Sequence, residues 1–212
     1  MTLQSYTKVK PLKVLIACEE SGVVRDAFRR LGHEAYSCDL LPNENPWHIR
    51  GDVLKELNAS WDLMIAHPPC THLCVSGAAW FKNKQQEQKE ALDFVKVLMD
   101  APIEKICIEN PISVISTRIR KPDQIIQPYE FGDPHRKSTC LWLKNLPKLQ
   151  PTNQVLPKLK ICSNNGKLEL MSKFHYDSFF LPKAERSKVR SRTFQGIADA
   201  MAEQWGKITL YE

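Results

Sequence analysis

The stretch DLMIAHPPC (residues 62–70) decides the fold of this chain. Residues 63–66 form a short, wholly apolar run, and two prolines follow it directly. A continuous apolar run of this length is typical of a strand that is covered on both faces, as in a parallel sheet. The pattern therefore predicts a buried strand over 62–66, followed by a stiff loop that presents Cys70.

Similar apolar runs lie on both sides of this strand, and they alternate with segments of helical periodicity. Strands alternating with helices predict an α/β sandwich: a mostly parallel sheet with helices on both faces. A hairpin is expected around the Asn164-Asn165-Gly166 turn, inside a proline-rich segment. The further expected strands are 13–18, 34–38, 49–53, 105–108, 124–129 and 139–143, and the expected helices are 23–31, 85–98 and 193–205.

Polar residues cluster directly after the predicted strands. In parallel sheets, ligands bind at the carboxyl ends of the strands. The sequence therefore predicts one site at that edge of the sheet. The residues that converge on it are Glu19, Glu20, Asp39, Asp52, Cys70 and Glu109.

Length and composition suit a soluble enzyme of modest size. The chain has 212 residues, of which 42% are hydrophobic, enough for one core with at most a small appendage. No apolar stretch is long enough to span a bilayer, and the polar, basic first residues do not resemble a secretory signal. Seven cysteines, an odd number, favour free thiols in a reducing compartment. We therefore expect a cytoplasmic protein without a membrane partner.

The formal net charge is +6, a mild bias towards a polyanionic partner. Basic residues concentrate in Lys183–Arg192 and Arg118–Lys121. A solvated basic surface explains the same charges equally well, so both interpretations remain open at this stage.

Two motifs resemble those of the cytosine-C5 methyltransferases. Pro68-Pro69-Cys70 is similar to the family's catalytic loop, in which the cysteine attacks C6 of cytosine. Ile108-Glu109-Asn110-Pro111 is similar to its Glu-Asn-Val motif, in which the glutamate contacts N3 and the exocyclic amine. The resemblance therefore implies that Cys70 and Glu109 are catalytic. Considered alone, Cys70 could instead be a buried structural thiol, or could bind metal together with His67, His72 and Cys74.

The resemblance also implies a Rossmann-like class I fold that binds S-adenosyl-L-methionine, without a metal. Asp39 would bind the ribose hydroxyls, and Asp52 the adenine amine. Lys137 and Thr139 stand where the family has two arginines. The cofactor-binding residues implied are Glu20, Gly22, Asp39, Asp52 and Pro68, and the substrate-binding residues are Ser76, Asn110, Arg136, Lys137, Arg190 and Arg192.

The expected domain organisation is a catalytic, cofactor-binding domain of residues 1–145 and 191–212, with a small insertion, 146–190, in place of a target-recognition domain. The expected reaction is transfer of a methyl group to C5 of a flipped cytosine in DNA through a covalent adduct of Cys70 with C6. The compact insertion suggests a phage or mobile element. Two alternatives remain: C5 modification of a free pyrimidine nucleotide or single-stranded nucleic acid, and a non-catalytic nucleic-acid-binding protein of the same fold.

Overall fold

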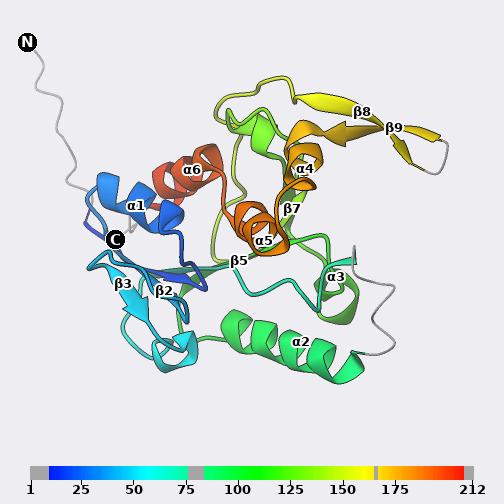
Figure 1. The fold of residues 1–212 in the computed structure, drawn as a ribbon. Coiled ribbons are helices and arrows are strands. Elements are labelled where there is room, and N and C mark those ends of the chain that lie inside the picture. Colours follow the sequence, from blue (N-terminus) through cyan, green and yellow to red (C-terminus); the bar gives the residue numbers. More distant parts are fainter. Residues whose placement is uncertain (1–9, 76–83, 165–166, 208–212) are drawn as a thin grey trace, which may run out of the picture.

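A seven-stranded sheet forms the centre of the protein (Figure 1). The computed structural model describes residues 10–75, 84–164 and 167–207. In these ranges the strand order is β3-β2-β1-β4-β5-β7-β6. The strands are β1 (Lys13–Ala17), β2 (Glu34–Asp39), β3 (His48–Arg50), β4 (Leu63–Ala66), β5 (Lys105–Pro111), β6 (Gln124–Ile126) and β7 (Thr139–Lys144).

The sheet is mostly parallel, as predicted. Strands β3, β2, β1, β4 and β5 all run in one direction, whereas β7 is antiparallel to both β5 and β6. The order 3-2-1-4-5 is that of the Rossmann-like sheets. In such sheets β2 and β3 are added on one side of β1, and the later strands, starting with β4, are added on its other side. Ligands of such sheets bind in the crevice outside the carboxyl ends of β1 and β4.

Helices cover both faces of the sheet. Helices α1 (Val23–Arg30) and α6 (Gln195–Trp205) lie on one face, and α2 (Gln85–Met99) lies on the other (Figure 1). In the part of the chain that the structure describes, no helix has both the length and the apolar character needed to cross a membrane.

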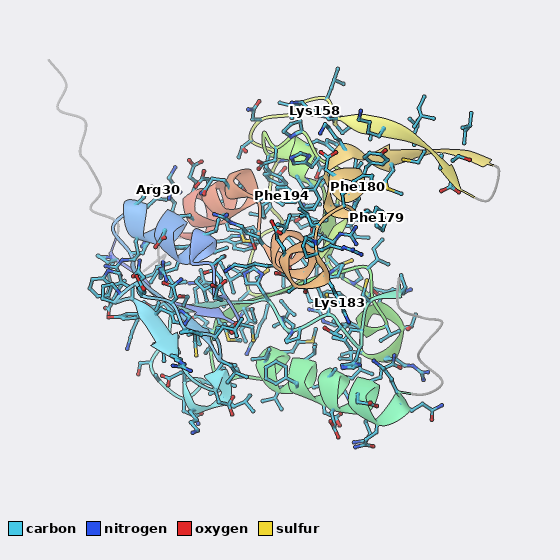
Figure 2. The ribbon with its side chains drawn as sticks, in the orientation of Figure 1. Arg30, Lys158, Phe179, Phe180, Lys183 and Phe194 are labelled. Atoms are coloured by element: carbon cyan, nitrogen blue, oxygen red, sulfur yellow. The ribbon has the colours of Figure 1, made fainter. Side chains whose placement is uncertain are left out.

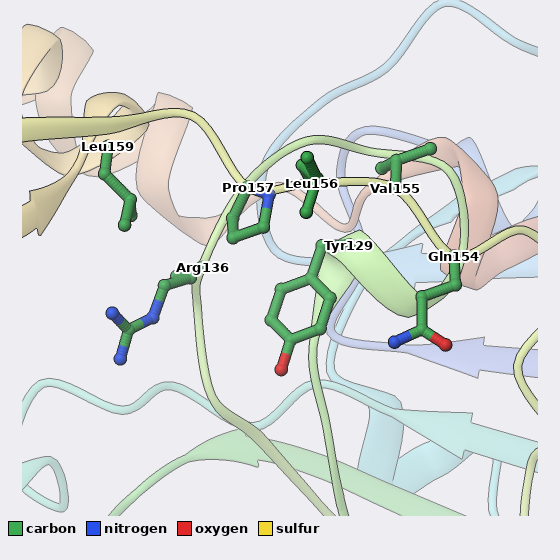
Figure 3. A pocket seen from close by; sticks show the side chains of 7 residues that line it. All are labelled: Tyr129, Arg136, Gln154, Val155, Leu156, Pro157 and Leu159. Atoms are coloured by element: carbon green, nitrogen blue, oxygen red, sulfur yellow. The ribbon is translucent and has the colours of Figure 1, made fainter.

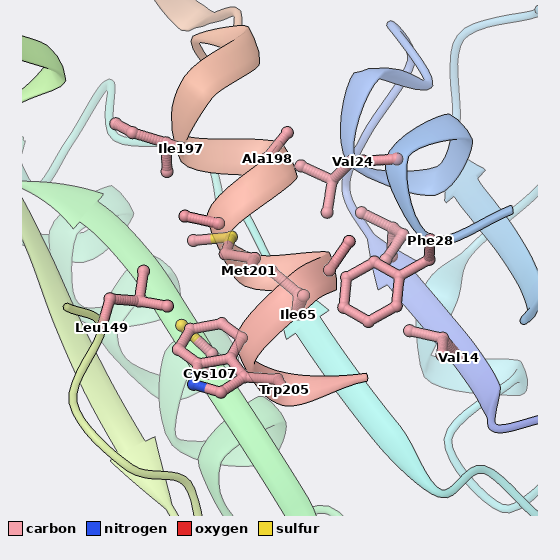
Figure 4. Close-up of a cluster of buried hydrophobic side chains, with 14 of the residues drawn as sticks. Val14, Val24, Phe28, Ile65, Cys107, Leu149, Ile197, Ala198, Met201 and Trp205 are labelled. Carbon is pink, nitrogen blue, oxygen red and sulfur yellow. The ribbon is translucent and has the colours of Figure 1, made fainter. Parts of the chain in front are cut away.

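Each face carries its own hydrophobic core, because successive side chains of a strand point in opposite directions. On one face, Val14 of β1 packs with Phe28 of α1 and with Met201 and Trp205 of α6 (Figure 4). On the other face, Leu15 belongs to the cluster that includes the apolar side of α2. Burying one large apolar side chain stabilises the fold by about 1.5–3 kcal/mol.

Three predicted strands end more than one residue away from where the structure ends them, each for an identifiable reason. The strand expected over 49–53 stops at Arg50, because Asp52 Oδ1 accepts a hydrogen bond (3.0 Å) from Leu54 N and so caps a 3₁₀ turn, η1 (Val53–Lys55). The strand expected over 105–108 continues to 111, because antiparallel β7 pairs with its last residues. The strand expected over 124–129 stops at 126, where a second turn, η3 (Pro128–Glu130), begins.

The segment between β7 and α6 contains the expected hairpin and two helices that were not predicted. Strands β8 (Leu159–Asn164) and β9 (Lys167–Ser172) pair antiparallel, and they project away from the main sheet (Figure 1). Helices α4 (Lys173–Ser178) and α5 (Lys183–Ser191) follow. Another short helix, α3 (Ile115–Arg118), follows β5.

Candidate active site

Strands β1 and β4 are adjacent and parallel, so the loops that follow them lie together. The turn of residues 18–22 follows β1, and the loop of residues 67–74 follows β4. His67 N donates a hydrogen bond (2.9 Å) to Ala17 O, so the two loops start side by side. Cys70 therefore lies at the edge of the sheet where a ligand is expected.

Hydrogen bonds fix the position of Cys70. Asn110, at the end of β5, is 1% exposed, and its Nδ2 donates a hydrogen bond (2.8 Å) to Pro68 O. Cys70 O accepts hydrogen bonds from Leu73 N (3.0 Å) and Cys74 N (2.9 Å), which turns the chain directly after the thiol. The two prolines restrict the preceding backbone. The thiol is half-buried on this rigid loop.

The surroundings of the Cys70 thiol favour its neutral form. Burial raises the pKa of Cys70, and the nearby Cys74 and Glu109 raise it further, while the Lys137 ammonium opposes them. The thiolate is the nucleophilic form of cysteine. A nucleophilic role for Cys70 would therefore require that the thiol lose its proton when a ligand binds.

Glu109 pairs with a buried histidine. His67 Nδ1 lies 3.4 Å from Glu109 Oε2, and the two side chains are 11% and 14% exposed. Burial lowers the pKa of His67, but the hydrogen bond and charge of Glu109 outweigh this and raise it. Burial raises the pKa of Glu109, but the hydrogen bond and charge of His67, with a contribution from Lys137, lower it. The two groups therefore stabilise each other as an imidazolium and a carboxylate.

Unsatisfied polar atoms surround the same loop. Among the described residues, the buried atoms His67 Nε2 and Asn110 Oδ1 have no hydrogen-bond partner, and neither has Ser113 Oγ. Buried polar atoms of proteins are nearly always hydrogen-bonded. A polar ligand beside Cys70 would supply the partners that the protein does not.

The turn after β1 is built around a buried arginine. Glu19 Oε1 accepts a hydrogen bond (2.8 Å) from Val24 N and so satisfies the start of α1. Gly22 has φ 72°, and a Cβ atom there would lie 2.1 Å from Arg25 Nη2. Arg25 is 2% exposed, and its Nη1 donates a hydrogen bond (2.8 Å) to Ser37 Oγ of β2. Only glycine fits at position 22.

The predicted cofactor acids lie along the same edge of the sheet. Asp39 ends β2, and its Oδ1 accepts a hydrogen bond (2.9 Å) from Leu41 N. Asp52 lies just after β3 and is exposed. Glu20 is partly engaged elsewhere, because its Oε1 lies 3.1 Å from Lys188 Nζ on α5. Carboxylates at neighbouring strand ends are acceptors that fit the hydroxyl and amine groups of an adenosine.

The predicted substrate residues divide into two groups. Lys137 acts electrostatically on Cys70, Glu109 and His67, so it belongs to the site. Its neighbour Arg136 is exposed and lines a different pocket. Asn110 holds the loop of Cys70, as described above.

The remaining substrate candidates lie elsewhere or outside the described ranges. Arg190 is held within the 146–190 segment, since its Nε donates a hydrogen bond (2.7 Å) to Ser178 Oγ and its guanidinium lies 4.6 Å from the Phe179 ring centroid. Arg192 is exposed and lines a pocket of about 270 Å³ beside Phe194. Ser76 lies outside the described residues.

The pair of His67 with Glu109 was not predicted, although the sequence contains a signal for it. Strands β4 and β5 pair in parallel with Ala66 opposite Ile108. The next residue of each strand is therefore His67 and Glu109. Knowledge of the register would have placed the two side chains together.

The metal alternative gains no support from the geometry. Within residues 10–75, 84–164 and 167–207, no three His, Cys, Asp or Glu side chains are grouped so that they could hold a metal ion. Cys70 itself is a free thiol. Comparison of the chain with protein-family models and with curated proteins finds no match.

Proposed function

We propose that this protein is an S-adenosyl-L-methionine-dependent enzyme that transfers a methyl group to C5 of cytosine in DNA. The observation that carries the proposal is the arrangement of Cys70 and Glu109. Both lie at the carboxyl ends of adjacent strands, and Asn110 holds the loop of Cys70 against β5. A nucleophile beside a proton-carrying group is what addition to a pyrimidine ring requires.

In the proposed reaction, Cys70 loses its proton to solvent and its sulfur forms a bond to C6. The electron pair of the C5–C6 double bond moves into the ring, where a proton bound at N3 stabilises it. C5 accepts the methyl group and then loses its own proton to a base. The bond from Cys70 to C6 breaks as the double bond is restored, and N3 returns its proton.

Glu109 and His67 supply the group that acts at N3. The carboxylate of Glu109 is kept ionised by His67, so it can accept a hydrogen bond from the exocyclic amine of cytosine. The His67–Glu109 pair also carries an ionisable proton, which it would deliver to N3 of a cytosine bound beside Cys70. In the imidazolium form of His67, the buried Nε2 provides a second hydrogen-bond donor.

The cofactor supplies an electrophilic methyl group when it is bound. Asp39 and Asp52 would hold its ribose hydroxyls and adenine amine, whereas the space beside the Gly22 Cα atom is taken by the Arg25 guanidinium. The Rossmann-like strand order supports the class I methyltransferase fold that we propose for this chain.

The distribution of charge supports a polymeric substrate. Residues 146–190 contain nine Lys and Arg against three Asp and Glu, whereas the rest of the chain contains 21 of each. The whole net charge of +6 therefore belongs to this segment. Figure 2 shows Lys158 beside the hairpin and Lys183 at the start of α5. A concentrated positive charge favours binding to phosphates of a nucleic acid over binding to a single nucleotide.

A covalent-trapping experiment tests the proposal. An oligonucleotide with 5-fluorocytosine at the target position cannot lose the C5 substituent as a proton, so the protein should remain attached through Cys70. Cys70→Ala should abolish the adduct, and Cys162→Ala, at the half-buried thiol of β8, should leave it unchanged. An adduct that still forms with Cys70→Ala would refute the proposal, as would the absence of any adduct with the unmodified protein and cofactor.

A further inference from the structure

A pocket of about 460 Å³ lies outside the site of Cys70 (Figure 3). Figure 3 shows Arg136 and Gln154 on either side of the Tyr129 ring. The rest of the lining is apolar and consists of Val155, Leu156, Pro157 and Leu159. Its size and its mixture of apolar walls with a few polar groups are typical of small-molecule sites.

Backbone hydrogen bonds build this pocket from two separate segments. Val155 N donates to Tyr129 O (2.9 Å), and Lys158 N donates to Pro134 O (2.8 Å). Arg136 N donates to Ser172 Oγ (3.2 Å) at the end of β9. The loop after β6 and the start of the hairpin are therefore fastened together, so the pocket is preformed.

The lining has the chemistry of a nucleobase site. The Tyr129 ring offers a stacking surface, and stacking of bases on aromatic side chains is the common means of binding unpaired nucleotides. The Gln154 amide can both donate to and accept from the edge of a base. The Arg136 guanidinium carries the positive charge that a phosphate requires. One wall, residues 154–159, belongs to the segment that holds the net charge of the chain.

The pocket opens on the same edge of the sheet as Cys70. Tyr129 follows β6, which runs parallel to β5, so both strands end at this edge. Cys70 follows β4, and β5 and β7 lie between β4 and β6, so three strand spacings, about 14 Å, separate the two sites. That separation corresponds to about four stacked nucleotides of a strand, and to fewer when the strand is stretched.

We propose that this pocket binds an unpaired base of the same strand, one to four nucleotides from the target cytosine. The inference rests on the proposed function, and it adds a second contact that a free nucleotide cannot make. A base in a duplex is stacked and paired, so entry into the pocket requires a strand that is unpaired at this position. The substrate is accordingly a polynucleotide with a single-stranded region at the target.

An abasic scan tests this proposal with single-stranded oligonucleotides. A fluorescent 15-mer with one cytosine is titrated with the protein, and its anisotropy gives the Kd. One abasic position is then moved from one to four nucleotides away on each side. At one position the Kd should rise about tenfold, the effect typical of losing one base stacked on an aromatic ring.

Variants of Tyr129 connect the scan to the pocket. Tyr129→Leu should weaken binding of the intact oligonucleotide to the same extent, and the abasic position should then have no further effect. Tyr129→Phe keeps the ring and should behave like the unmodified protein. Circular dichroism checks that each variant is folded, and the scan with the unmodified protein stands without any variant.

The outcomes separate this inference from the proposed function. A flat scan in the unmodified protein, or an unchanged position dependence in Tyr129→Leu, would overturn the pocket assignment. If the 5-fluorocytosine adduct on Cys70 still forms in that case, the pocket assignment is wrong but the proposed reaction is kept. If the scan gives the expected peak but no adduct forms, the pocket is a base-binding site of a protein without the proposed activity.

Discussion

The buried pair of His67 and Glu109 gives a quantitative prediction for stability. Replacing His67 by Leu leaves the Glu109 carboxylate buried without its partner, while Lys137 still lowers the pKa of this carboxyl. Breaking a buried ion pair by removing one partner costs about 3–5 kcal/mol. Because Lys137 remains, we expect His67→Leu to lower the free energy of unfolding by about 3 kcal/mol at pH 7.

The opposite change should cost less. In Glu109→Leu the imidazole of His67 can lose its proton, since burial lowers the pKa of His67 once the carboxylate has gone. The loss is then about 1 kcal/mol, that of one hydrogen bond. The double variant replaces both groups by apolar ones and should cost about 1 kcal/mol, so the two changes should be non-additive by about 3 kcal/mol.

The pH dependence of this pair follows from the directions of the two pKa shifts. Glu109 has a lowered pKa, so its contribution is complete above the ordinary value of 4.5 and is lost as the pH falls through the lowered one. His67 has a raised pKa, so its contribution is complete below the ordinary value of 6.5 and is lost as the pH rises through the raised one. The pair therefore stabilises the protein most between these two values.

Urea unfolding of the four proteins, followed by tryptophan fluorescence, measures these quantities. Trp142 and Trp205 are each at most 1% exposed, so their emission should report global unfolding. The defect of His67→Leu should shrink as the pH falls, because the unpaired Glu109 then takes up a proton. If the loss of stability in the double variant equals the sum of the two single-variant losses to within about 0.5 kcal/mol, the reasoning is refuted.

Two further predictions concern Cys70 and a glycine of α6. Because the charge of Glu109 helps to raise the pKa of Cys70, Glu109→Gln should speed alkylation of Cys70 by iodoacetamide at pH 8, measured by mass spectrometry; unchanged or slower alkylation would contradict this. Gly196→Ala should lower stability by about 2 kcal/mol in urea unfolding, because the added Cβ atom would lie 1.7 Å from Phe131 O. Gly51→Ala, where nothing lies within 4 Å, is the matched control; equal losses in the two variants would exclude the steric explanation.

Local patterns predicted the parallel half of the fold well. The apolar runs of β1, β2 and β4 are short and bounded by turns, and the structure has strands there that differ from prediction by one residue at most. The polar residues after these strands meet at one edge, because parallel strands end on the same side. The ends of these three strands coincide with local turn residues, so the sequence alone predicts them.

These local patterns could not predict contacts between residues that are far apart in the chain. The end of β5 depends on β7, which is 28 or more residues later in the chain. Arg25 has the pattern of an ordinary helix cation, yet it is buried because Ser37 and Gly22 accommodate it. Asp52 was predicted as a cofactor-binding residue from its order in the chain. The structure shows in addition that its side chain caps η1.

Helix α6 has a consequence for how the protein is made. Its residues Ile197, Met201 and Trp205 complete the core on one face of the sheet, and Gly196 N donates a hydrogen bond (2.9 Å) to Asp133 Oδ2. On the ribosome, β1, β4 and the Cys70 loop emerge long before α6 is synthesised, so the apolar face that α6 covers stays open on the nascent chain. Such a face is a target for chaperones and a cause of aggregation. The supply of correctly folded protein should therefore depend on how promptly translation reaches α6, and translational pausing before that helix should be costly.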